Sequence, residues 1–116
     1  MQKLVVFILL LLIGSPGYGA TQDEIDHLLA FVETSNCVFI RNGNEYAAAD
    51  AVSHINKKYR YFEDDIDSAE KFIQLSATKS TRTSQPYYIE CPGTEKIQSS
   101  TWLLLELGRY RSDANI

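Results

Sequence analysis

His54 has a carboxylate and an ammonium group at helical spacing. Asp50 lies four residues before it, and Lys58 lies four residues after it. Side chains four residues apart share one side of a helix, so Asp50 is placed to orient the imidazole ring. An oriented histidine can act as a general base. The spacing indicates one candidate function, a small cell-envelope hydrolase or an enzyme accessory. A solvated network on the helix surface, without catalysis, is the favoured account.

Other patterns that could support catalysis are incomplete. Ser76 and Lys79 match the Ser-x-x-Lys pattern of penicillin-recognising enzymes, but the chain is too short for that fold and lacks its Ser-Asp-Asn and Lys-Thr-Gly motifs. Ser53 adjoins His54 in the sequence, yet consecutive residues of a helix do not face each other. The sequence therefore favours a non-enzymatic protein.

The sequence also lacks a recognisable metal-binding pattern. His27 and His54 are the only histidines and are not at ligand spacing, and His27 is expected at the surface or boundary of a helix. The acidic run 63–67 lacks the glycine and the distal glutamate of an EF-hand loop. We therefore expect no metal and no cofactor.

A polar segment, residues 79–85, carries groups that suit ligand binding. It contains Lys79, Arg82 and several hydroxyl side chains, and Tyr87 and Tyr88 follow it. Cations, hydroxyls and tyrosine rings together can hold a carboxylate, a sugar or a peptide. A soluble loop without a ligand is the simpler alternative.

The N-terminal segment has the order of a secretory signal peptide. A positive start at residues 1–3 precedes ten apolar residues at 4–13 and then a stretch of small and helix-breaking residues. Ten helical residues span about 15 Å, roughly half of a bilayer core. We predict a signal peptide at 1–19, cleavage before Ala20 and one periplasmic domain at 20–116, with no stable membrane insertion.

The acidic charge balance excludes some partners. The whole chain has a net charge of −4, and loss of Lys3 with the signal peptide leaves 10 basic and 15 acidic residues. An acidic domain with scattered Lys and Arg gives no electrostatic basis for binding nucleic acid or an anionic membrane surface.

Cys37 and Cys91 are expected to form a structural disulfide. They are the only cysteines, and an exported domain folds in an oxidising compartment. No Cys-x-x-Cys motif supports a redox role. Paired free thiols or a metal site are the remaining alternatives.

The periodicity predicts an α+β fold, a small and mainly helical domain. We expect four helices around a minimal two- or three-stranded antiparallel sheet with one disulfide, in the order α-β-α-α-β-α. Asn42-Gly43 predicts a turn, after which 44–46 is either a short strand arm or the start of the next helix. The expected helices are 22–34, 48–62, 68–78 and one that begins at Ser99 or Ser100, and the main strands are 38–40 and 87–91.

Two predicted helices have N-terminal capping signals. Thr21 and Glu24 fit a capping box at the start of the first helix. Asp67, with Glu70 three residues later, fits the start of the third helix.

An ordered set of short motifs resembles a known family over residues 21–111. The motifs are Phe39-x-Arg41-Asn42-Gly43-x-x-Tyr46, Ala51-x-x-His54-Ile55-x-x-Lys58, Ala69-Glu70-x-Phe72-Ile73, Lys79-Ser80 and Pro86-Tyr87. The chain resembles the YfeK-like family, small exported proteins of Gram-negative bacteria that carry a domain of unknown function. Members commonly have small residues with glycine before Pro-Tyr, where this chain has Ser84-Gln85. The resemblance implies a single periplasmic domain and no particular activity.

The polar members of these motifs form the candidate ligand-binding site. We expect a monomer that binds an unidentified periplasmic protein or a cell-envelope ligand through the side bearing Arg41, Lys79 and Tyr87. A stress-related structural protein without a discrete site is a third hypothesis. The candidate residues are Arg41, Asn42, Tyr46, His54, Lys58, Lys79, Ser80 and Tyr87.

Overall fold

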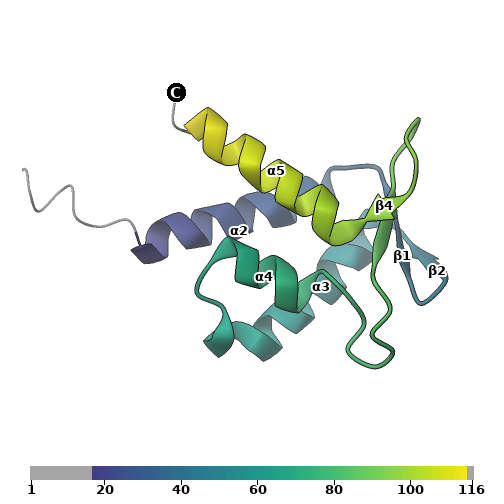
Figure 1. The fold of residues 1–116 in the computed structure, drawn as a ribbon, viewed down its shortest axis with the longest axis horizontal. Helices are drawn as coiled ribbons and strands as arrows, with labels where there is room; N and C mark the ends of the chain where they lie inside the picture. Colours follow the sequence, from purple (N-terminus) through teal and green to yellow (C-terminus); the bar gives the residue numbers. More distant parts are fainter. Residues whose placement is uncertain (1–16, 115–116) are drawn as a thin grey trace, which may run out of the picture.

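The computed structural model describes residues 17–114 as an α+β domain in which helices extend from a small sheet at one end (Figure 1). The described helices are α2 (Gly17–Glu33), α3 (Ala48–Phe62), α4 (Ala69–Ser76) and α5 (Ser99–Ala114), with a 3-10 turn η1 (Glu63–Asp65) after α3. None of them is long and apolar enough to span a bilayer. Most of the predicted signal peptide lies outside the described residues, and α2 continues through its predicted cleavage point.

The sheet has four antiparallel strands, one or two more than expected. They are β1 (Val38–Arg41), β2 (Asn44–Tyr46), β3 (Tyr88–Glu90) and β4 (Ile97–Gln98), in the order β2-β1-β3-β4. Segment 44–46 is therefore a strand arm. Asn42 and Gly43 both have positive φ, 53° and 80°, as a two-residue hairpin turn requires.

The disulfide prediction is confirmed, and the bond lies between the two central strands of this sheet. Cys37 and Cys91 are bonded, with 54 residues of sequence separation, and immediately precede and follow the paired residues Val38 and Glu90. The bond therefore ties the two inner strands, which are remote in sequence, at one end of their pairing.

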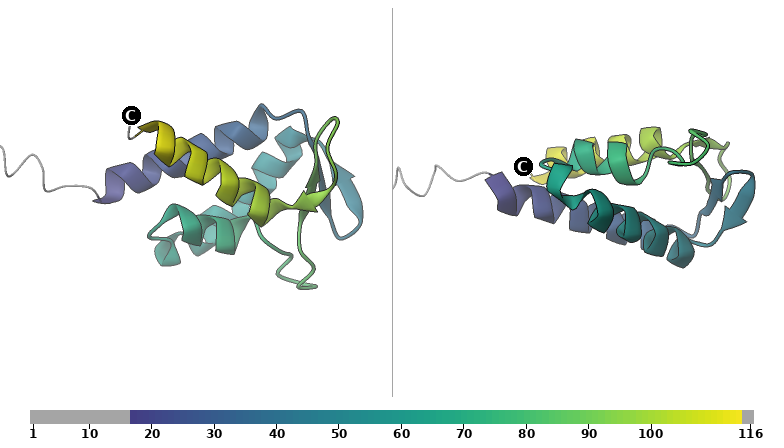
Figure 2. Two further views of the ribbon diagram at one scale, coloured as in Figure 1. Left: turned by 45° about the horizontal axis from the view of Figure 1, so that its top comes forward. Right: turned by 90° about the horizontal axis from the view of Figure 1, so that it is seen from below.

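The core lies between the helices. The four helices run out from the sheet in two layers, with α2 and α3 below α4 and α5 in the right-hand view of Figure 2. Ile25 and Leu28 of α2 and Phe72 of α4 are each at most 1% exposed. The buried residues of α2 recur at the helical period, as the sequence predicted.

Both capping predictions are wrong at the residue level. Helix α2 begins at Gly17, so Thr21 lies within it and no capping box starts the helix there. Helix α4 is capped by Ser68, whose Oγ accepts a hydrogen bond from the Lys71 N–H at 3.1 Å. Asp67 is thus one residue too early to act as the cap.

Candidate functional site

The principal candidate site is a cationic groove, an open cavity of about 750 Å³ at the junction of β1, α3 and the 79–86 loop. Five of the chain's eleven Lys and Arg residues line it, and no carboxylate does. Such a clustering in an acidic chain favours negatively charged ligands. The five cations are Arg41, Lys57, Lys58, Arg60 and Arg82.

Helix spacing brings much of the groove together. His54, Lys58 and Tyr61 recur at i, i+4 and i+7 on α3, so they share one side of the helix. Within residues 17–114 none of the five groove cations forms an ion pair, whereas Arg109 and Arg111 of α5 are both paired with carboxylates. The positive charge of the groove is therefore not neutralised by the described part of the chain.

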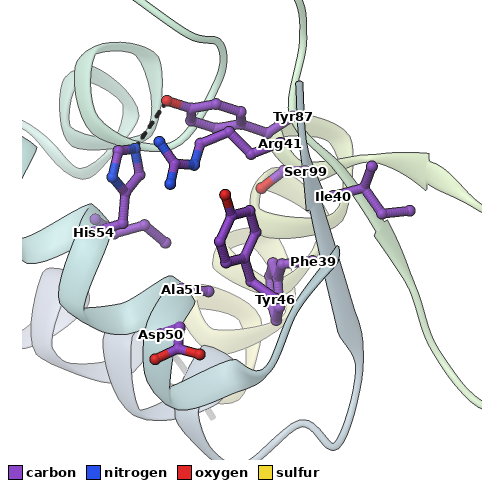
Figure 3. Close-up of a pocket in the computed structure, with 10 residues that line it drawn as sticks. Phe39, Ile40, Arg41, Tyr46, Asp50, Ala51, His54, Tyr87 and Ser99 are labelled. Carbon is purple, nitrogen blue, oxygen red and sulfur yellow. Dashed lines mark hydrogen bonds between the residues drawn. The ribbon is translucent and has the colours of Figure 1, made fainter. Parts of the chain in front are cut away.

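Arg41 is the innermost of these cations. Arg41 as a whole is half-buried. Its guanidinium lies 4.8 Å from the centre of the Tyr46 ring and forms no hydrogen bond with any residue from 17 to 114. In Figure 3 it points toward His54, with the Tyr87 ring on one side and the Tyr46 hydroxyl on the other. Five N–H donors in a fixed fork are thus available to a bidentate anion.

His54, Lys58 and Tyr87 form a hydrogen-bonded network beside Arg41. The Lys58 ammonium donates to the Lys79 carbonyl oxygen at 2.8 Å and to the Tyr87 hydroxyl at 3.3 Å, and that hydroxyl lies 3.0 Å from His54 Nε2 (Figure 3). Lys58 donates to the Tyr87 oxygen, and the Tyr87 hydroxyl donates to His54 Nε2 in the tautomer that carries its proton on Nδ1. The network fixes α3 against the segment that leads into β3.

The environment of this network holds the imidazole neutral. Burial, followed by the positive charges of Arg41, Lys58 and Lys57, lowers the pKa of His54 from 6.5 to about 4. Burial and Arg41 also lower the pKa of Lys58, and burial raises the pKa of the Tyr87 hydroxyl. Burial is the largest cause of each of these three pKa shifts, because it disfavours the charged form of a group.

The expected partnership of Asp50 with His54 is wrong. No hydrogen bond joins them in the described region, and the ring instead contacts Tyr87. In Figure 3 Asp50 lies apart from His54 with its carboxylate directed away. A histidine among cations, with no acid to orient it, is a poor general base near neutral pH.

The ring of His54 is expected to titrate with a midpoint near pH 4. An unfolded histidine takes up its proton near pH 6.5, so the free energy of unfolding should fall as the pH falls from about 6.5 to about 4. Titration of the imidazole Cε1 protons by NMR measures the midpoint, and His54→Gln assigns the signal. A midpoint near 6.5 for His54 would contradict the neutral, buried arrangement.

Three other predicted site residues form hydrogen bonds that hold the 79–86 loop, and of these only Ser80 lines the groove. Asn42 accepts a hydrogen bond from Thr83 Oγ1 at 2.7 Å. The buried Ser80 hydroxyl accepts from the backbone N–H groups of Arg82 and Thr83 at 3.2 and 3.3 Å. Lys79 supplies its carbonyl to Lys58, while its exposed side chain does not line the groove.

Several groove residues were not among the predicted site residues. Lys57 and Arg60 lie in the second half of α3, and Arg82 lies in the polar segment 79–85. Tyr61, 82% exposed, and Phe62 add an aromatic wall. The positions of Lys57 and Tyr61, three and seven residues after His54, are the signal that identifies this side of α3.

A much smaller inner cavity, of about 40 Å³, adjoins the groove. Arg41, His54 and Tyr87 line both spaces and therefore form their boundary. The rest of its lining is mostly apolar. These other residues are Phe39, Ile40, Tyr46, Asp50, Ala51, Ile55 and Ser99.

The remaining catalytic candidates have structural roles. Ser76 is fully buried whereas Lys79 is exposed, which is incompatible with a shared nucleophilic site. His27 lies partly buried in the middle of α2, with Nε2 2.6 Å from a carboxylate oxygen of Glu106. Arg109 also binds the Glu106 carboxylate, so this buried acid is fully paired. No group of three or more potential metal ligands occurs within residues 17–114.

The fold and the groove define a small, disulfide-linked α+β domain with a site suited to anions, and comparison with known proteins places it in a family. A model described as "Family of unknown function (DUF5329)" matches residues 19–111, and the chain belongs to this family. One relative is "Uncharacterized protein YfeK" from Salmonella typhimurium, 32% identical over 92 residues, which cover 75% of this chain and 77% of that protein. The predicted YfeK-like resemblance is thereby confirmed. No solved structure matches the chain.

Proposed function

We propose that the protein is a non-enzymatic periplasmic binding module that holds an anionic group of a protein or a cell-envelope ligand in the cationic groove. The observation that carries the proposal is Arg41, a half-buried residue whose guanidinium has no hydrogen-bonding partner in residues 17–114. Four further cations line the same space without an opposing carboxylate. A half-buried cation without an acid partner gains most from a ligand that supplies one.

The periplasmic part of this proposal rests on the N-terminal sequence and on the disulfide. The apolar run with its charged start is typical of export, and a bonded Cys37–Cys91 pair is typical of an oxidising compartment. The hydrolase alternative has lost its main support, because His54 has no orienting carboxylate.

Arg41→Ala is expected to weaken binding of an anionic probe at least about tenfold, since a charge-assisted hydrogen bond contributes about 1.5–3 kcal/mol. A fluorescein-labelled hexaglutamate with an amidated C-terminus serves as the probe, with fluorescence anisotropy as the measurement. Wild-type affinity should also fall as salt concentration rises. Thermal unfolding should change little, because Arg41 forms no ion pair with the described residues.

Lys79→Ala is the matched control. It removes the same charge from the adjoining loop, but its side chain lies outside the groove. The control should bind the probe nearly as well as the wild type. Equal losses in both variants, or no binding by the wild-type protein, would contradict the proposal. A crosslinking pull-down from periplasm, compared between wild type and Arg41→Ala, then identifies the natural ligand.

A further inference from the structure

The inner cavity restricts what can accompany the anion. Its volume of about 40 Å³ has room for about three water molecules, which is enough for a methyl group and too little for a long side chain. Ala51 and Ile55 of α3 and Phe39 of β1 supply apolar walls. The cavity meets the groove at Arg41, so a small apolar group inside it lies next to the guanidinium.

We propose, building on the proposed function, that the groove binds the C-terminal carboxylate of a peptide that ends in alanine. The alanine methyl group occupies the inner cavity, and the carboxylate pairs with Arg41. The preceding residues of the peptide extend along the outer groove.

The chemistry of the boundary favours this ligand over other anions. A carboxylate matches the planar fork of a guanidinium through two parallel hydrogen bonds. In an alanine terminus, one carbon atom joins the carboxylate to the methyl group, so both meet the protein at neighbouring points. A phosphate monoester is attached through a polar oxygen and has no such apolar branch. A fatty acid needs an apolar channel far larger than this cavity.

The outer groove indicates the character of the preceding residues. Lys57, Arg60 and Arg82 are exposed cations there, and Tyr61 offers a largely exposed ring. Acidic side chains in the two or three residues before the terminus would face this charge. Asp50 also lines the inner cavity, but its carboxylate is directed away from Arg41 (Figure 3). It therefore leaves the Arg41 end of the cavity free for the anion.

Fluorescence anisotropy with labelled Gly-Glu-Gly-Glu-Gly-Ala tests the inference on the wild-type protein. Amidation of the terminus should weaken binding at least about tenfold, because it removes the charge that Arg41 pairs with. Replacing the terminal alanine by leucine should weaken binding by a similar factor, since the larger side chain exceeds the cavity. Both L- and D-alanine termini are measured: preference for the L form assigns a protein terminus, and preference for the D form assigns a cell-wall peptide.

Ala51→Leu is the matched variant, since it fills the inner cavity and leaves every groove cation in place. It should remove the advantage of an alanine terminus while retaining affinity for the amidated hexaglutamate. Ile55→Val enlarges the same cavity and should improve binding of a valine-terminated peptide relative to the alanine one. Circular dichroism confirms that each variant is folded, and the second variant keeps the test valid if the first does not fold.

The outcomes separate this inference from the proposed function. Binding of the amidated hexaglutamate without any gain from a free alanine terminus would overturn the alanine-carboxylate inference alone. Stronger competition by phosphoserine than by acetyl-alanine would also overturn it, in favour of a phosphate ligand. Failure of the wild-type protein to bind any of the probes would overturn both.

Discussion

Reduction of the Cys37–Cys91 disulfide is expected to lower the free energy of unfolding by about 4 kcal/mol. The bond closes a loop of 54 residues, and the chain-entropy model assigns about this value to such a loop. Small domains have a total stability of about 5–15 kcal/mol, so the loss is a large fraction of it. Urea unfolding followed by circular dichroism, with and without a reducing agent, measures the difference.

The double variant Cys37→Ala/Cys91→Ala is the control for the reducing agent. It should unfold at a urea concentration close to that of the reduced wild type, and the reducing agent should not shift it further. If reduction leaves the wild-type midpoint unchanged, the loop-closure argument fails for this domain.

Phe72→Ala is expected to destabilise the domain by about 3–5 kcal/mol, as is typical when a buried phenylalanine is truncated. Phe72 is 1% exposed in α4, and its ring packs edge-on against Tyr59 of α3 at 5.2 Å between centroids. Truncation leaves a cavity between the two helices, which cannot collapse without moving α4. Urea unfolding again provides the measurement.

Tyr61→Ala is the matched aromatic truncation on the same pair of helices. Tyr61 is 82% exposed, so its loss should change the free energy of unfolding by no more than about 0.5 kcal/mol. Similar effects of the two truncations would show that Phe72 is not part of a closed core.

Local patterns predicted the large elements well. The apolar residues of α3 recur at the helical period over its whole length. The predicted disulfide and the predicted strands 38–40 and 87–91 both occur in the structure, where β1 pairs with β3. Strand β4 was missed because two residues, Ile97-Gln98, carry no period. It forms because β3 presents a free edge to them, a tertiary cause that local sequence does not encode.

The site was predictable only in part, for a related reason. The proximity of Arg41 and Tyr87 followed from placing their segments in one sheet, and both now line the groove. The partner of His54 was not predictable, because helical spacing favoured Asp50 while the fold brings Tyr87 from 33 residues away. The contribution of Arg82 likewise depends on how the loop folds back over α3.

The sheet order β2-β1-β3-β4 separates two timescales of folding. The β1–β2 hairpin needs only a two-residue turn, so it can form within microseconds once folding begins. Pairing of β1 with β3 must wait until α3 and α4 are accommodated between them, and such long-range closure is slow. During synthesis from the N-terminus Cys37 is made well before Cys91, so its thiol remains without its native partner through that interval. The Cys37–Cys91 bond reaches its native position at the end of the β1–β3 pairing only when α3 and α4 have folded between the two strands.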